Sequence, residues 1–185
     1  MPIIQLYHPQ GSLDQPRKAA LAQKLTDVLI IMEGGAATTA GRAFATVLMT
    51  EVNPDSWFVG GHVDATFVAK AGKFLVYVTI PEGYMNAAHK TEVHSSVTAA
   101  ILEATGHQTD LGAGANILVV ISEVPEGNWG AGGKTIGLGS IAEAVGLPKD
   151  GKRFEWIEEY FAAKQRALHS AGYPDDMGGL ISPER

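Results

Sequence analysis

Pro2 stands at a position where a proline can do acid–base chemistry. Inside a chain the proline nitrogen is an amide without basicity, whereas at a free N-terminus it is a secondary amine. The ordinary pKa of an α-amino group is about 7.7–8.0, and burial in an apolar pocket lowers it because the charged form is disfavoured. Such an amine can remove a proton α to a carbonyl and return it to another carbon. If it stays protonated, it can act as an acid in adding water to an activated alkene.

His8 is a second candidate, because it ends the first predicted strand a few residues after Pro2. A histidine at a strand end either lines a site or is solvated. Other chemistries find little support. The histidines show no His-Glu-x-x-His pattern for a metal, and Gly133-Lys134-Thr135 lacks the first glycine of a P-loop. No Gly-x-Ser-x-Gly elbow is present. We therefore predict neither a cofactor nor a metal.

Composition narrows the class of protein. The chain has 185 residues, of which 45% are hydrophobic and 18% charged, as in a folded globule. A net charge of −6 argues against a nucleic-acid-binding surface. Without cysteine there is no disulfide, thiol nucleophile or thiolate zinc site. The apolar runs fall far short of the ~20 residues that span a membrane. The N-terminus lacks the basic and apolar regions of a signal peptide, so we expect a cytoplasmic protein.

An internal repeat organises the chain. Shifted by 72 residues, the sequence overlays on itself without a gap from 2–63 onto 74–135. The matched residues include two tryptophans, two Gly-Gly pairs and two Glu-Val pairs: Trp57 and Trp129, Gly60-Gly61 and Gly132-Gly133, Glu51-Val52 and Glu123-Val124. We interpret residues 1–135 as one domain of two duplicated units.

Each unit is predicted to form a strand, a helix and a second strand. The strands are rich in β-branched and aromatic residues, at 3–7 and 45–52 in the first unit and at 74–78 and 117–124 in the second. The apolar positions of the helices form one stripe: Leu21, Leu25, Val28, Leu29 and Met32, matched by Val93, Val97, Ala100, Ile101 and Ala104. Asp14 and Asn86 occupy N-cap positions, and Gly34 and Gly106 C-cap positions.

Two such units predict an α/β (α+β) fold with a four-stranded mixed sheet and two helices on one face. The strands are apolar on both sides, so the other face needs a cover, and we expect a homo-oligomer, most simply a homotrimer. Residues 136–185 differ from the repeat. A capping-box pattern at 140–143 predicts the start of a short helix. A longer helix follows at 154–170, and the last residues form an arm.

The repeat resembles the tautomerase superfamily. The resemblance lies in Met-Pro-Ile-Ile-Gln, the Pro-x-Gly turns, the strands ending in Glu-Val, and Asn128-Trp129-Gly130-Ala131-Gly132-Gly133. The nearest type is 4-oxalocrotonate tautomerase, whose short chain is one such unit. Fused units occur in longer members, among them the cis-3-chloroacrylic acid dehalogenase group. The resemblance covers roughly residues 2–135 and leaves the C-terminal helices unexplained.

The resemblance implies that removal of Met1 exposes Pro2 as the catalytic amine, once per chain, because the equivalent residue is Phe74. It also implies that Trp129 forms a wall of the pocket, although a turn anchor packed on the sheet is an equal alternative. The arginines that hold substrate carboxylates in well-known members are missing here. Their places hold Ser12, Thr46, Tyr84 and Leu118. Arg42 is the nearest arginine to the second strand.

These features predict a cofactor-independent keto–enol tautomerase acting on a small oxo or enol acid. Pro2 is the predicted general base, and Trp129, His8 and Arg42 are the predicted substrate-binding residues. Without the family's arginines we expect a substrate with at most one carboxylate. Two alternatives remain open. One is hydration or dehalogenation of a small unsaturated acid, and the other is a non-catalytic superfamily member.

Overall fold

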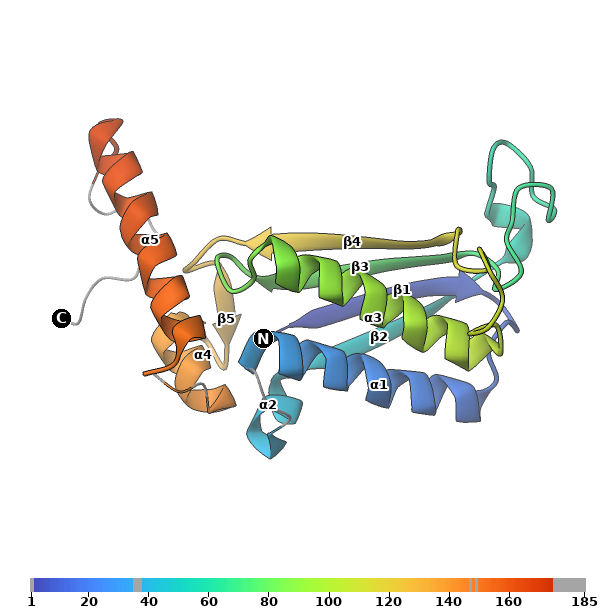
Figure 1. Ribbon diagram of the computed structural model, residues 1–185, viewed down its shortest axis with the longest axis horizontal. Helices are drawn as coiled ribbons and strands as arrows, with labels where there is room; N and C mark the ends of the chain where they lie inside the picture. The colour runs from blue at the N-terminus through green and yellow to red at the C-terminus, as the bar shows by residue number, and fades with distance from the viewer. Residues whose placement is uncertain (1, 35–37, 147, 149, 175–185) are drawn as a thin grey trace.

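The two halves of the repeat form two β-α-β units of one sheet (Figure 1). The computed structural model describes residues 2–34, 38–146, 148 and 150–174. The first unit consists of β1 (Ile3–Pro9), α1 (Gln15–Gly34) and β2 (Thr46–Val52), with a short α2 (Thr39–Phe44) before β2. The second unit consists of β3 (Phe74–Pro81), α3 (Ala87–Thr105) and β4 (Ile117–Val124).

The strand order β2-β1-β3-β4 confirms the predicted four-stranded mixed sheet. Strands within each unit are parallel, whereas the central strands β1 and β3 are antiparallel, with Ile3 opposite Thr79. The sheet therefore has two distinct ends. At the Pro2 end, β1 and β2 begin while β3 and β4 finish. At the opposite end, called the Phe74 end, β3 and β4 begin while β1 and β2 finish.

Equivalent ion pairs show that the duplication persists in three dimensions. Lys18 Nζ lies 2.7 Å from Glu51 in the first unit, and Lys90 Nζ lies 2.8 Å from Glu123 in the second. Each pair joins the first turns of a helix to the end of the strand that follows it. The predicted N-caps are also observed. Asn86 accepts a hydrogen bond from the His89 amide at 2.9 Å, and Asp14 accepts one from the amide three residues later.

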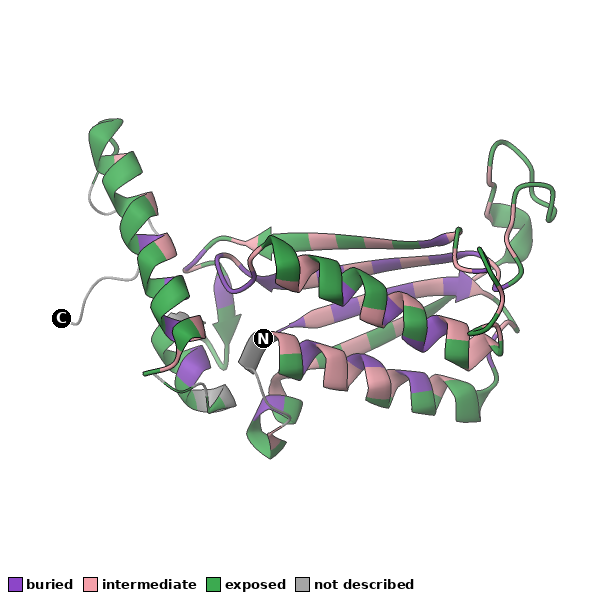
Figure 2. Ribbon diagram, in the orientation of Figure 1, coloured by how far each residue is buried: buried purple, intermediate pink, exposed green. Residues whose placement is uncertain are grey.

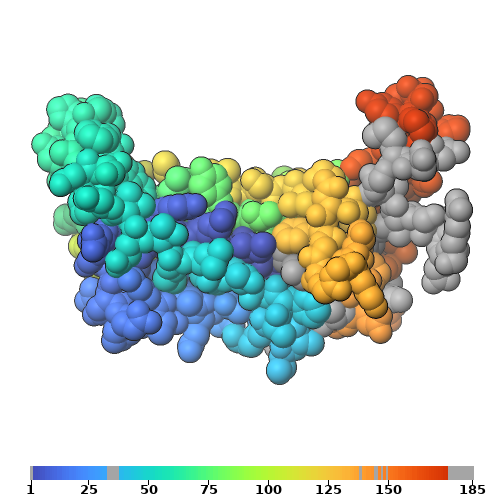
Figure 3. All heavy atoms as spheres, turned by 180° about the vertical axis from the view of Figure 1, so that it is seen from behind, coloured from blue at the N-terminus to red at the C-terminus, as the bar shows by residue number. Residues whose placement is uncertain are grey.

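The helices cover only one face of the sheet (Figure 1). Alternate strand residues on that face are buried against the predicted helix stripes, and Figure 2 shows this burial along β1 and β3. The fully buried members include Ile4, Leu6, Val76, Val78, Leu25, Leu29, Val93 and Val97. The opposite face is uncovered (Figure 3) and carries both polar and apolar side chains; Leu48, Leu118 and Val120 are exposed on it.

Each unit ends in a tight Gly-Gly turn. Gly60 and Gly132 both have φ of 58°, and the glycines after them also have positive φ, as a type I′ hairpin turn requires. In the second unit this turn joins β5 (Trp129–Ala131) to β6 (Lys134–Ile136). The repeat predicts the turn, whereas the two short strands that flank it are a finding of the structure.

The C-terminal helices α4 (Leu138–Val145) and α5 (Lys152–Ser170) lie at the Pro2 end (Figure 1). The prediction that α4 starts with a capping box at Ser140 was wrong. The N-cap is Gly137, directly after β6, and no side chain caps the helix. The end of the hairpin therefore sets the helix start. None of the described helices is long and apolar enough to cross a membrane.

A second, smaller core holds these helices. Its buried members are Tyr84, Ile141, Ala142, Phe154, Ile157 and Phe161. A polar contact fixes α5 to the end of β3: the Glu82 carboxylate accepts hydrogen bonds from Tyr160 Oη at 2.7 Å and from Lys164 Nζ at 2.6 Å. Burial favours the neutral acid, but the bonds from Lys164 and Tyr160 outweigh it and lower the pKa of Glu82. Burial and the contact with Glu82 raise the pKa of Tyr160 to about 12.

The docking of α5 can be tested with two equivalent glycines. Gly11 and Gly83 have nearly the same φ, 76° and 78°. A Cβ on Gly11 would meet nothing within 4 Å, whereas one on Gly83 would lie 2.5 Å from the Tyr160 ring. We expect Gly11→Ala to lower the free energy of unfolding by about 1 kcal/mol and Gly83→Ala by about 3 kcal/mol, measured by urea unfolding. Equal losses in the two variants would contradict the packing of Tyr160 on Gly83.

Candidate active site

Pro2 is buried beside the central strands of the sheet. Its carbonyl oxygen accepts a hydrogen bond of 3.1 Å from the Thr46 amide, which ties it to the start of β2. By the register of β1 with β3, Pro2 lies next to the last residues of β3. An amine here would be shielded from water on several sides. Met1 lies outside the described residues.

Trp129 lies at the same end, because β5 follows β4 after only four residues. Its side chain is only 8% exposed, and its indole Nε1 has no hydrogen-bond partner. Leaving a buried donor unpaired costs about 1–3 kcal/mol, and such groups are rare in folded proteins. His89, in the first turn of α3, also has a buried ring nitrogen, Nδ1, without a partner. Two ring nitrogens at the Pro2 end are thus uncommitted.

The cations of the Pro2 end are largely engaged. Lys90 pairs with Glu123, and Lys164 binds both oxygens of Glu82. Arg153 of α5 donates hydrogen bonds to the carbonyls of Ile31 and Met32 at the end of α1. Burial, together with the charge of Arg153, lowers the pKa of His89 and so favours its neutral form. Because Arg153 lies outside the repeat, no sequence pattern predicts its contact with α1.

Arg42 lies near this end but is committed to another residue. It belongs to α2, which leads into the start of β2, and its guanidinium forms an ion pair with Asp27 of α1. Both side chains are close to half exposed. The contact explains the position of Arg42 as a link between α1 and α2. Its predicted role in binding substrate stays a prediction.

Within one chain, His8 lies far from Pro2. It ends the buried row of β1 at the Phe74 end, and its side chain is fully buried, so the alternative of a solvated histidine was wrong. Nδ1 lies 2.9 Å from Ser12 Oγ and 3.1 Å from the Pro9 carbonyl oxygen, while Nε2 has no partner. The ring stacks on Phe74 with centroids 6.4 Å apart. Pro2 and His8 therefore occupy opposite ends of the same strand.

Trp57, the counterpart of Trp129, lies at the Phe74 end and is only half-buried. Its carbonyl oxygen accepts a hydrogen bond of 2.7 Å from the Nζ of Lys73. The same ammonium donates to the Val63 carbonyl at 3.0 Å, and the Lys73 side chain is buried. This contact holds the loop between β2 and β3 against the start of β3. Trp57 thus belongs to a loop anchor and not to the surroundings of Pro2.

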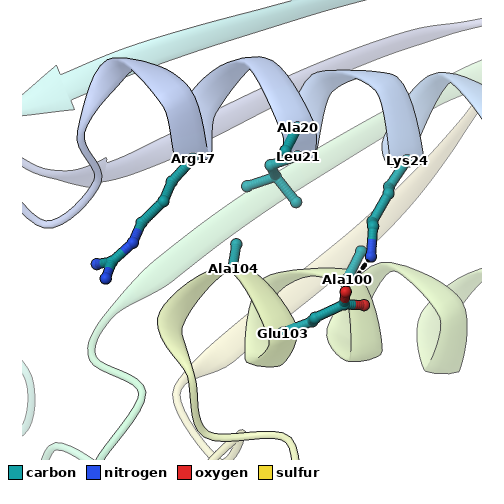
Figure 4. Close-up of a pocket in the computed structure, with 7 residues that line it drawn as sticks. All are labelled: Arg17, Ala20, Leu21, Lys24, Ala100, Glu103 and Ala104. Atoms are coloured by element: carbon teal, nitrogen blue, oxygen red, sulfur yellow. Dashed lines mark ion pairs between the residues drawn. The ribbon is translucent and has the colours of Figure 1, made fainter.

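A hollow of about 210 Å³ lies between α1 and α3 (Figure 4). Alanines form most of its floor, and an ion pair between Lys24 and Glu103 crosses it. Its other lining residues include Arg17 near the start of α1 and Ala104 near the end of α3, so it lies nearer the Phe74 end. This hollow does not include Pro2. In the part of the chain that the structure describes, no three His, Cys, Asp or Glu residues are grouped as metal ligands.

Comparison with known proteins finds several solved structures of similar fold. No protein-family model and no curated protein matches the sequence. Among solved structures, the chain is similar to a member of the cis-3-chloroacrylic acid dehalogenase (cis-CaaD) family, with 22% identity and a TM-score of 0.58 over 91% of this chain and 96% of that one. It is also similar to a native fused 4-OT, with 21% identity and a TM-score of 0.57 over 72% and 94%. For the macrophage migration inhibitory factor of Toxoplasma gondii, the identity is 12% and the TM-score 0.55 over 72% and 99%.

The chain has the tautomerase-superfamily fold. The expected resemblance is thereby confirmed at the level of the fold. The cis-CaaD family member covers 91% of this chain, which is more than residues 1–135 make up. The similarity therefore extends into the C-terminal helices. In this fold the two halves supply one proline, Pro2, and one phenylalanine, Phe74, at equivalent strand starts.

The burial of His8 predicts a pH-dependent stability. Burial lowers its pKa below the ordinary 6.5 of the unfolded chain, and the nearby charge of Lys18 acts in the same direction. The Pro9 carbonyl and Glu51 oppose this shift without reversing it. The unfolded state therefore binds the proton more readily. The contribution of His8 is present well above pH 6.5 and is lost as the pH falls through 6.5 toward the lower pKa of the folded state.

Replacing His8 by its counterpart in the second unit tests this. The equivalent residue is the fully buried Ile80, so His8→Ile introduces a side chain that the fold already accepts at this position. We expect this variant to show a flatter decline of unfolding free energy between pH 7.5 and 5.5 than the wild type. Denaturant unfolding across this range measures it. The control is His94→Gln, at an exposed helix position. A pH dependence that His8→Ile leaves unchanged would refute the assignment.

Proposed function

We propose that this chain is a cofactor-independent keto–enol tautomerase whose general base is the amine of Pro2. The observation that carries the proposal is the place of Pro2 in the tautomerase fold: buried at the start of a central strand, where the duplicate unit has Phe74. An internal phenylalanine offers no amine. The proposal therefore assigns one site to each chain.

The proposed reaction moves one proton within the substrate. The neutral amine takes a proton from the carbon or oxygen of a small oxo or enol acid and returns it to another atom, so no cofactor is consumed. Removal of Met1 is required, because only then is the nitrogen an amine. Burial supports the neutral form of the amine, which the base needs.

Charge at the Pro2 end supports a substrate with at most one carboxylate. The positions of the family's arginines hold uncharged residues, and Arg42 is paired with Asp27. Glu82 and Glu123 are held here by Lys164 and Lys90, so those lysines are already neutralised. A second substrate carboxylate would find no buried, unpaired cation among the described residues of this end, since Lys134 of β6 is exposed, and its desolvation would be unfavourable.

A second candidate function is addition of water to a small unsaturated acid, with dehalogenation as one form of it. The observation in its favour is the extent of the structural alignment. The member of the cis-CaaD family covers 91% of this chain, whereas the native fused 4-OT covers 72%. Chloride release from cis-3-chloroacrylate distinguishes the two, because tautomerisation releases none.

We further propose a homotrimer formed through the uncovered face of the sheet. Its exposed apolar residues support burial between chains. Fused 4-OT proteins of similar fold are described as symmetric and asymmetric trimers. The proposed particle has three times the 19.5 kDa of one chain.

Replacement of the secondary amine of Pro2 tests the proposed base. We expect Pro2→Ala to lower kcat/KM for ketonisation of phenylenolpyruvate by about 10²-fold or more, because the general base loses its secondary amine. One extra residue before Pro2 should do the same, since it turns the nitrogen into an amide. Circular dichroism serves as the control for folding. Unchanged rates in both variants would exclude Pro2 catalysis, and a wild type without any turnover would favour a non-catalytic role.

A charge on the uncovered face tests the assembly. Leu118 is 58% exposed in the single chain and lies on that face. We expect Leu118→Asp to dissociate the trimer into folded monomers, because a buried carboxylate without a partner opposes association. Light scattering measures the mass. Leu111→Asp is the matched control, since Leu111 is fully exposed in a loop. A wild-type protein that scatters as a monomer at micromolar concentration would contradict the proposed trimer.

A further inference from the structure

The unpaired indole nitrogen of Trp129 needs an explanation. An indole N–H only donates, so no rearrangement of its own protons can satisfy it. The ring is more than nine-tenths buried and its Nε1 has no partner. Its counterpart Trp57 is half-buried, so burial of this N–H does not follow from the duplicated turn. The difference between the two units points to a use at the Pro2 end.

The hairpin holds the ring in place. Trp129 pairs with Ile136 across β5 and β6, and Ile136 packs against the second core. The Gly132-Gly133 turn closes the hairpin with both residues at positive φ. Because the hairpin holds the ring, the N–H is preorganised. A ligand oxygen can then accept its hydrogen bond without the cost of ordering the donor.

The other groups at this end determine which ligand suits the donor. Lys90 and Lys164 are already bound to carboxylates. Burial and the charge of Arg153 lower the pKa of His89 and so favour its neutral form. Among the described residues at this end, the buried ring nitrogens of Trp129 and His89 have no partner, whereas Lys134 on β6, for which no ion pair is found, is exposed. Neutral donors can satisfy one carboxylate in a water-poor site, but they do not offset the desolvation of two.

We propose that the Trp129 indole N–H binds the carboxylate of the substrate and selects small oxo acids with a single carboxylate. Trp129 then determines specificity and takes no part in the proton transfer itself. This inference rests on the proposed function, since it places the substrate at Pro2. A pocket wall would need only the aromatic surface of Trp129, whereas this proposal requires its indole N–H.

Binding of phenylpyruvate, measured by titration calorimetry on the full chain, tests the proposal. We expect Trp129→Phe to raise Kd about tenfold, as loss of a hydrogen bond to a charged group predicts. Trp57→Phe, at the equivalent turn, should stay within about twofold of the wild type. With the methyl ester of phenylpyruvate, Trp129→Phe should change Kd by less than about twofold.

A second replacement separates the N–H from packing. Incorporation of 3-benzothienylalanine at position 129 keeps the bicyclic shape and replaces the N–H by sulfur. We expect it to weaken phenylpyruvate binding as much as Trp129→Phe does, with an unchanged Tm. Wild-type affinity in this protein would overturn the proposal, as would equal losses in Trp57→Phe or no binding of phenylpyruvate by the wild type at millimolar concentration.

Binding requires no proton transfer, so the two proposals fail separately. If Pro2→Ala leaves turnover unchanged while binding still depends on the Trp129 N–H, the proposed catalytic base is wrong and this inference stands. If turnover depends on Pro2 while Trp129→Phe leaves KM and Kd unchanged, this inference is wrong and the proposed base stands.

Discussion

The antiparallel contact between β1 and β3 joins the two units, and the arrangement of the whole molecule depends on it. Five residue pairs, from Ile3 opposite Thr79 to Tyr7 opposite Leu75, form this contact. Because the central strands run in opposite directions, Pro2 and Phe74 come to opposite ends of one sheet. Both helices return over the same face, which buries one side of the sheet and leaves the other open, with large apolar side chains exposed on it.

The duplication accounts for the fold, whereas the differences between the two units bear on the proposed chemistry. The two units keep the same ion pair between helix and strand, Lys18 with Glu51 and Lys90 with Glu123. They differ in polar character at positions of similar burial. His8 of the first unit takes the place of Ile80, and both are fully buried. A polar residue in an apolar position costs stability, which makes such differences informative about function.

The repeat and its hydrophobic stripes were sufficient to predict the strands, both long helices and the sheet, because these follow from local pattern. Contacts between distant segments were not predictable. The burial of His8 depends on Phe74, and the docking of α5 depends on Glu82, 78 residues before Tyr160. The start of α4 at Gly137 followed the hairpin and not the capping pattern at Ser140. At the site, the position of Pro2 was predictable, whereas the unpaired N–H of Trp129 was visible only in three dimensions.

Catalysis by Pro2 requires that its nitrogen is an amine in the mature protein. A ¹⁵N NMR titration of protein labelled at its nine prolines measures this directly. Eight prolines are internal tertiary amides and do not titrate. We expect one titrating nitrogen, absent in Pro2→Ala, with an apparent pKa at or below the ordinary value of about 8 for an α-amino group. Nine nitrogens that do not respond to pH would contradict it, because Pro2 would then be an amide without basicity.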